Sequence, residues 1–435
     1  MGTGQGTDRW RSLYAGGSPP TETGIGAATV RRQRRRRRRA WVATAVLLAI
    51  TGLVAYILVP RWWFSPTAYV DHLGYGPYEG EMPADLHAQL AKAVPGLVSF
   101  VEKERGLSFQ APPTVVFLPD QLFSRELSSH VAFQQRHYVG GATYDALGWA
   151  HRGDTFDRFT LDLHGNDVVS LYGDWDGTIY LRGHALTPLA KAQLVGLLTQ
   201  SLDDQTFNLA AVYGPDAEQD ERTAYDALVA GDDAYVQRAY LAGRPLAERC
   251  AIAPVLHLPV DRRACTVAAS KDQPVTDPIT AEIRFPQEFG LRFVTLLRSQ
   301  AGTKALDAAF RHPPRSTADV MSPPHYRLDK AFQVVPAPPH EGELVDFGTL
   351  GAYTLALALA DGQPGKVDAG NAVEGWRGDS FSTYRKGSGG PTCVSDTAVF
   401  DSQAQADHYA ARARSSGATT HEGPGARAVS IRICH

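Results

Sequence analysis

Residues 186–209, LTPLAKAQLVGLLTQSLDDQTFNL, form the stretch of sequence on which the prediction of the fold rests. Thr187 followed by Pro188 is a typical helix start, because threonine caps the first turn and proline tolerates the first helical position. The next residues are mostly apolar as far as Leu202, which indicates a helix in the interior of a globular domain. A polar segment that begins at Asp203 then ends the pattern.

Other short patterns follow in a fixed order on both sides of this stretch. Asp176-Gly177 supplies turn residues for a hairpin just before it. Downstream, Ser316 can cap a short helix, with Asp319 three residues later. The full set comprises FVEKERGLSF at 100–109, the strand and turn at 115–123, YGDWDGTIYLR at 172–182, AYDALVAGDDA at 224–234 with Tyr240-Leu241, FP at 285–286 with GLRFV at 290–294, PPRSTADV at 313–320 and EGWRGD at 374–379.

This ordered set resembles a family of membrane-anchored bacterial zinc metallopeptidases of the gluzincin type. In that family the matching helix reads roughly LTP…HELTHALQDQHFDL, and the resemblance covers most of residues 83–415. It implies an α+β fold, with a zincin-like domain of one small sheet and several helices, followed by a C-terminal α+β unit. One transmembrane helix would precede both.

The zinc-binding residues of that family are absent here. Two histidines four residues apart on one helix face can share a zinc ion, and the glutamate after the first acts on zinc-bound water. The matching positions are Gly196, Leu197 and Gln200, and the third ligand, a glutamate in the family, falls on Ala230. The resemblance therefore implies a degenerate member with no catalytic residue, no metal and no cofactor.

The function expected from this pattern is that of a pseudo-metallopeptidase that binds a peptide or an envelope protein without cleaving it. The alternative is an active hydrolase or peptidase with an unrecognised metal or catalytic set. A purely structural envelope protein is a third reading. The sequence has neither a GxSxG nucleophile motif nor a Walker-type phosphate loop, and residues 387–390 (GSGG) are expected to form a hairpin turn.

Acidic residues gather at the end of the degenerate helix and in the second motif, at Asp203, Asp204, Asp232 and Asp233. Paired carboxylates can act as acid and base or bind Ca²⁺. We expect them instead to cap helices and hold the fold. His130 and His137 lie seven residues apart and are expected at the surface rather than in a metal site.

The N-terminal region predicts a membrane anchor. Residues 40–60 begin with about twenty uncharged, mostly apolar residues, enough to cross a bilayer as a helix. The arginines before it are expected to keep the N-terminus in the cytoplasm and to contact anionic lipid rather than nucleic acid. They form an unbroken run of Arg34, Arg35, Arg36, Arg37, Arg38 and Arg39. A cleaved signal peptide is the alternative, but no small-residue cleavage site follows the apolar run.

Charge and cysteine content agree with this topology. Residues 1–39 carry about +8, which leaves about −11 for the rest of a chain whose net charge is −3. All four cysteines fall in the predicted exterior part, where an oxidising compartment favours disulfides. The order along the chain suggests the pairs Cys250–Cys265 and Cys393–Cys434.

The sequence divides into five predicted regions: a disordered cytoplasmic tail at 1–39, the span at 40–60, a linker at 61–82, the peptidase-like domain at 83–340 and the C-terminal unit at 341–435. Periodicity predicts helices at 85–104, 221–241, 286–301, 304–311 and 402–414, and an apolar helix-length segment at 347–360. Strands are expected near 114–118, 168–172, 178–181, 372–376, 380–384, 395–400 and 428–434.

Overall fold

The computed structural model describes residues 73–75, 84–134, 140–149, 168–173, 176–183, 185–211, 217–261, 263–265, 278–323, 326, 332–360, 369–387 and 389–435. These residues belong to one compact unit of mixed α+β structure with two small sheets. Within that described part, no helix is long and apolar enough to cross a bilayer. The predicted span at 40–60 and the tail at 1–39 lie outside the described residues.

The first sheet has four strands in the order β1-β2-β4-β3. β1 (Leu73–Tyr75), β2 (Thr114–Leu118) and β4 (Thr178–Arg182) are parallel, and β3 (Ser170–Gly173) pairs antiparallel with β4 at the edge. The turn between β3 and β4 contains the predicted Asp176-Gly177, and the Asp176 carboxylate accepts a hydrogen bond from the Thr178 amide at 2.9 Å. The predicted hairpin is therefore confirmed.

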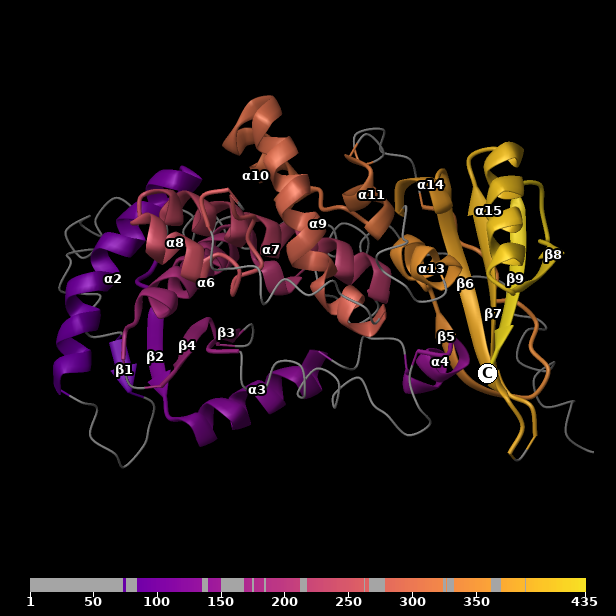
Figure 1. The fold of residues 1–435 in the computed structure, drawn as a ribbon, viewed down its shortest axis with the longest axis horizontal. Coiled ribbons are helices and arrows are strands. Elements are labelled where there is room, and N and C mark those ends of the chain that lie inside the picture. The colour runs from indigo at the N-terminus through magenta and orange to yellow at the C-terminus, as the bar shows by residue number, and fades with distance from the viewer. Residues whose placement is uncertain are drawn as a thin grey trace, which may run out of the picture. The chain divides into compact units, whose positions relative to one another are not determined.

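Helices cover both faces of this sheet (Figure 1). Val115 and Phe117 of β2 face the core made with α2 (Ala84–Arg105) and α6 (Pro188–Phe207). Val116 and Leu118 face α3 (Asp120–Gln134) on the other side. The alternation follows from the two-residue period of a strand and explains why residues 115–118 of β2 are all apolar.

The two helices that follow the first sheet in the chain pack against each other. α6 begins as predicted, with the Thr187 hydroxyl accepting a hydrogen bond from the Ala190 amide at 3.1 Å. A short 3₁₀ turn, η4 (Leu209–Ala211), leads towards α7 (Gln219–Ala242). α8 (Leu246–Ile252) comes next, and the predicted disulfide Cys250–Cys265 ties its end to the following segment.

α9 (Pro278–Ala301) corrects the predicted helix at 286–301, because it starts eight residues earlier. Pro278 takes the first helical position, and Pro286 lies inside the helix although proline normally breaks one. The extra turns bury Ile279, Ala281 and Phe285 in the interior, which offsets the lost backbone hydrogen bond. α10 (Thr303–Arg311) and α11 (Thr317–Met321) follow, and Ser316 caps α11 as predicted.

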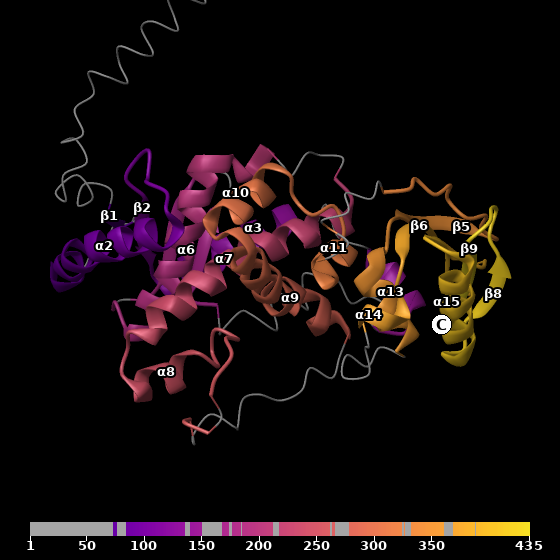
Figure 2. The same ribbon diagram turned by 90° about the horizontal axis from the view of Figure 1, so that it is seen from above.

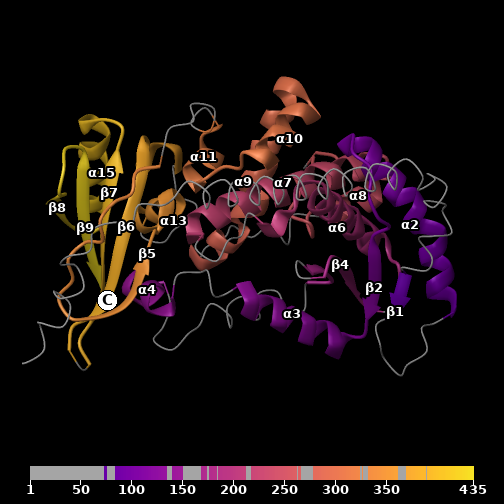
Figure 3. The same cartoon turned by 180° about the vertical axis from the view of Figure 1, so that it is seen from behind.

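The second sheet has five antiparallel strands in the order β5-β6-β7-β9-β8. Figures 1 and 3 show α15 (Gln403–Ser415) lying along one face of it. The predicted disulfide Cys393–Cys434 joins directly paired residues of β7 and β9. The strands are β5 (Glu343–Gly348), β6 (Trp376–Arg385), β7 (Thr392–Phe400), β8 (Thr419–Glu422) and β9 (Ala428–Cys434).

Two predictions in this region need correction. The apolar segment at 347–360 is not one element, because residues 343–348 pair with β6 as a strand and α13 (Gly351–Leu359) starts after them. The predicted strand at 372–376 is instead the end of α14 (Ala369–Ala372) and a turn into β6. α4 (Gly141–Ala146), from the upstream part of the chain, packs on the same core.

Buried carboxylates hold the start of α13 from two sides. Asp220 of α7 accepts a hydrogen bond from the Thr317 hydroxyl at 2.5 Å, and the same hydroxyl accepts one from the Tyr353 amide at 3.0 Å. Asp379 of β6 accepts hydrogen bonds from the amides of Leu350 and Gly351 at 2.8 and 3.0 Å. These bonds join the second sheet to the upstream helices.

Asp379 has a second buried carboxyl beside it, that of Asp396. The two residues are diagonal neighbours on β6 and β7, because Asp379 pairs with Ala398 and Asp396 pairs with Phe381. Burial raises the pKa of Asp379 to about 6 and raises that of Asp396 well above its usual range, with the Asp379 charge adding to the effect on Asp396. Folding therefore takes up a proton at pH values above the ordinary aspartate pKa.

This proton uptake predicts a stability that falls as the pH rises. Each proton bound on folding costs up to about 1.4 kcal/mol per pH unit until the folded-state pKa is reached. Asp396→Asn keeps the shape and removes that titration, so its melting temperature should decline less between pH 5 and 8 than that of the parent. Asp407→Asn, at an exposed position of α15, is the control. Parallel melting curves for parent and Asp396→Asn would contradict the assignment.

Candidate functional site

The sequence positions that match zinc ligands in the resembling family lie on α6 and α7, which pack against each other and are drawn in magenta in Figure 2. Gly196, the position of the first histidine, is buried. A β-carbon added there would come within 2.5 Å of the Gln237 side-chain nitrogen. That nitrogen donates a hydrogen bond to the Ala192 carbonyl at 3.1 Å. The Gln237 amide thus occupies the space into which a side chain at 196 would extend.

The three atoms nearest to an added β-carbon at 196 all belong to Gln237 and not to the other three positions. Leu197 and Gln200 are half-buried on α6, and Ala230 is half-buried on α7. Gln237, which faces Gly196, lies seven residues after Ala230, or roughly 10 Å along the helix axis. The described contacts therefore place Gln237, and not the predicted third position, opposite the first.

The buried polar centre of this region is a cluster around Arg105, the last residue of α2. Its guanidinium donates to the Asp203 carboxylate of α6 at 2.6 and 3.0 Å and forms an ion pair with Asp232 of α7 at 2.5 Å. A third hydrogen bond of 3.1 Å reaches Asp307 of α10. Arg105, Asp203 and Asp232 are fully buried. We call these four residues the Arg105 cluster, and it joins four helices.

Charge in the Arg105 cluster is unbalanced, because one guanidinium faces three carboxylates. Arg298 of α9 adds a second cation, 3.9 Å from Asp232. Burial would lower the pKa of Arg105, but the carboxylates of Asp232 and Asp203 outweigh it and raise that pKa. Burial raises the pKa of Asp203 and of the neighbouring Asp233, and in Asp203 it outweighs the opposing effect of Arg105. The cluster is thus set up to hold helices together rather than to bind a further anion.

The rest of the polar tail of α6 also has structural partners. The Asp204 carboxylate accepts hydrogen bonds from the Tyr172 hydroxyl at 2.7 Å and from the Leu209 amide at 2.9 Å. Gln205 forms hydrogen bonds with both residues of the segment 110–111. Phe207 stacks on Phe310, with ring centroids 4.8 Å apart. The polar segment at the end of α6 therefore fastens this helix to its neighbours.

Sequence reasoning expected a structural role for Asp203, Asp204, Asp232 and Asp233, and the contacts of Asp203, Asp204 and Asp232 agree with it. It missed Arg105 and Gln237. Arg105 was visible within the motif at 100–109, but its partners lie 98 or more residues away. Gln237 had no local signal, because its importance depends on the missing side chain of Gly196.

The described part of the chain contains no group of three or more His, Cys, Asp or Glu residues arranged to hold a metal ion. His137 and the side chain of His130 lie outside the described residues. No protein-family model, curated protein or solved structure matches the chain. The resemblance to zinc metallopeptidases therefore rests on the quoted motifs alone.

Proposed function

We propose that this chain is a single-pass, membrane-anchored pseudo-metallopeptidase that acts outside the cytoplasm by binding a partner rather than by hydrolysis. The observation that carries the proposal is that positions 196, 197, 200 and 230 carry neither an imidazole nor a carboxylate. A zinc-binding histidine at 196 would need the volume that the Gln237 amide now fills. The Arg105 cluster supports the same conclusion, because Asp203 of α6 and Asp232 of α7 are paired with a cation that holds the helices together.

The two disulfides fit an extracytoplasmic location. The basic tail and the apolar segment at 40–60 support an anchor with a cytoplasmic N-terminus. A reporter that is active only in the cytoplasm should then be active when it is fused before Arg31. A reporter signal from the outer side of the membrane would contradict this topology.

The absence of metal chemistry is tested by the metal content of the purified chain. We expect zinc far below one atom per chain and no hydrolysis of a mixed peptide library, because neither imidazole ligand nor glutamate base is present at 196, 197 and 200. A zinc peptidase purified in the same way serves as the positive control. Stoichiometric zinc that a chelator removes together with peptide hydrolysis would favour the alternative, an active peptidase.

A further inference from the structure

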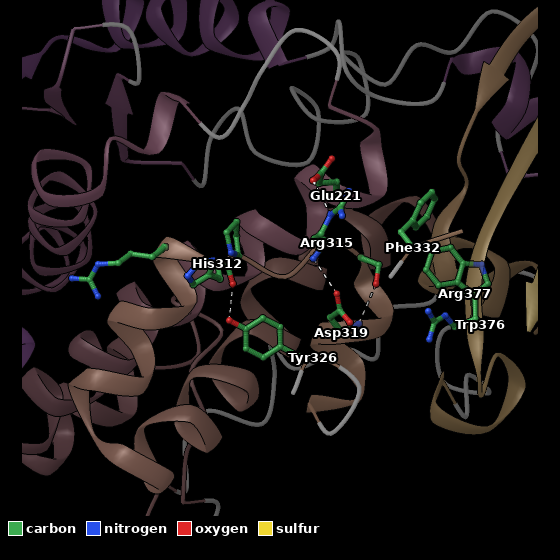
Figure 4. Close-up of a pocket in the computed structure, with 11 residues that line it drawn as sticks. Glu221, His312, Arg315, Asp319, Tyr326, Phe332, Trp376 and Arg377 are labelled. Atoms are coloured by element: carbon green, nitrogen blue, oxygen red, sulfur yellow. Dashed lines mark hydrogen bonds and ion pairs between the residues drawn. The ribbon is translucent and has the colours of Figure 1, made fainter. Parts of the chain in front are cut away.

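A cleft of about 560 Å³ lies away from the degenerate helix face, and none of the positions 196, 197, 200 and 230 lines it. Figure 4 shows it among the start of α7, the segment from the end of α10 into α11, and the first residues of β6. Its volume is typical of sites that take a small molecule. The lining residues that matter here are Glu221, Arg315, Asp319, Phe332 and Arg377.

Hydrogen bonds fix the walls of this cleft. The Ser316 hydroxyl accepts from the Asp319 amide, and the Asp319 carboxylate accepts from the Arg315 amide at 3.0 Å. On the opposite wall, the Gln333 amide donates to the Arg377 carbonyl at 2.8 Å, which ties the neighbouring Phe332 to β6. Because the walls are already ordered by these hydrogen bonds, ligand binding costs less conformational entropy.

Three arginines line the cleft, Arg311, Arg315 and Arg377, and Arg315 is the one whose guanidinium is largely exposed. The Arg315 side chain is 65% exposed, and its ion pair with Glu221 is long, at 3.7 Å. Such a pair in water contributes little, so an incoming anion can compete with Glu221 for the guanidinium. Arg377, at the start of β6, is only 11% exposed and already pairs with Asp401 at 3.3 Å. Guanidinium groups suit carboxylate and phosphate because their planar N–H donors match two oxygens at once.

An aromatic surface lies beside these cations. Phe332 lines the cleft and packs on Trp376, with ring centroids 5.9 Å apart. Tyr326 also lines the cleft, and its hydroxyl donates to the His312 carbonyl at 2.6 Å. The combination favours a ligand that carries an anionic group on a planar, apolar part.

We propose that this cleft binds a small organic anion, with Arg315 pairing its carboxylate or phosphate and Phe332 contacting its planar part. The inference deepens the proposed function, since it rests on a chain that binds rather than hydrolyses. It places binding outside the former metal site. The expected ligand is defined by its chemistry, as a molecule with an anionic group on a planar, apolar part.

Calorimetric titration of the full chain tests the proposal with phenyl phosphate, benzoate and benzylamine as probes. We expect one or both anionic probes to bind and benzylamine not to bind, and the stronger anionic probe identifies phosphate or carboxylate. Arg315→Gln should weaken binding about tenfold, the usual effect of losing a charged hydrogen bond. Arg412→Gln, at an exposed position of α15, should leave the affinity unchanged.

Glu221→Gln gives the sharper result, because the variant releases Arg315 from its competing carboxylate. Binding of the anionic probe should tighten by about two- to fivefold, the range expected from a weak exposed ion pair. Three outcomes would overturn the site: no probe binds at millimolar concentration, Arg315→Gln binds like the parent with an unchanged melting temperature, or benzylamine binds and Glu221→Gln abolishes it. Zinc content tests the proposed function separately, so the two failures are distinguishable.

Discussion

The Gly290→Ala variant is expected to lose about 3 kcal/mol or more of unfolding free energy, a severe effect for one methyl group. Gly290 of α9 lies where this helix crosses α7, and a β-carbon there would overlap the carbonyl oxygen of Ala227. Gly231 faces it from α7, and a β-carbon at 231 would overlap the Gly290 carbonyl. The obstructing atoms are backbone, so only separation of the helices can relieve the clash.

Denaturant unfolding of parent and variant measures this loss. Gly96→Ala is a matched control, because Gly96 is exposed in the middle of α2 and nothing lies within 4 Å of an added β-carbon. Alanine there should stabilise the chain by about 0.5 to 1 kcal/mol, since it is a better helix former. A Gly290→Ala variant as stable as the parent would mean that α7 and α9 are not in backbone contact.

The Arg105→Met variant should lose about 3 to 5 kcal/mol of unfolding free energy, the usual cost of leaving a buried charge without its partner. Methionine keeps much of the side-chain volume, so the loss reports on charge rather than on a cavity. Asp203 and Asp232 would remain buried without their main cation. Adding Asp203→Asn and Asp232→Asn to Arg105→Met should recover part of the stability, because the unpaired charges are then gone.

The effect of Arg105→Met should depend on pH in a defined direction. The pKa of Asp203 is already raised, and loss of Arg105 removes an interaction that lowers it. A group with a raised folded-state pKa destabilises the fold increasingly as the pH rises towards that pKa. The difference between parent and variant should therefore be smaller at pH 4 to 5 than at pH 7 to 8.

Arg244→Met provides the comparison at the surface. Arg244 forms an exposed ion pair with Glu248 at 3.2 Å, so its replacement should change the unfolding free energy by less than about 1 kcal/mol at any of these pH values. If Arg105→Met and Arg244→Met had the same unfolding free energy, the Arg105 cluster would not stabilise the packing of the four helices.

Local signals in the sequence predicted local structure well. Thr187-Pro188, Asp176-Gly177 and Ser316 each act through hydrogen bonds to residues within three positions, so their effect does not depend on the rest of the fold. The predicted start of α9 was wrong because proline at 286 normally signals the start of a helix. Burial of Phe285 and the residues before it, which needs the other helices, extended the helix past that signal.

The prediction of one helix-length element at 347–360 was wrong for a similar reason. Its apolar composition suits a helix, but Phe347 and Gly348 pair with Ser382 and Phe381 of β6. A strand forms there because β6 offers a partner, and no pattern within the segment records that partner. Strand formation depends more on such context than helix formation does.

The sequence by itself determined that residues 186–209 form a buried helix, that four cysteines make two disulfides, and that the metal-binding residue types are absent at 196, 197, 200 and 230. Only the tertiary structure decided what surrounds these positions. Gln237 occupies the space at Gly196, and Arg105 pairs with Asp203 across 98 residues of chain. Both depend on side chains that meet only after the helices pack, and local sequence carries no record of such distant contacts.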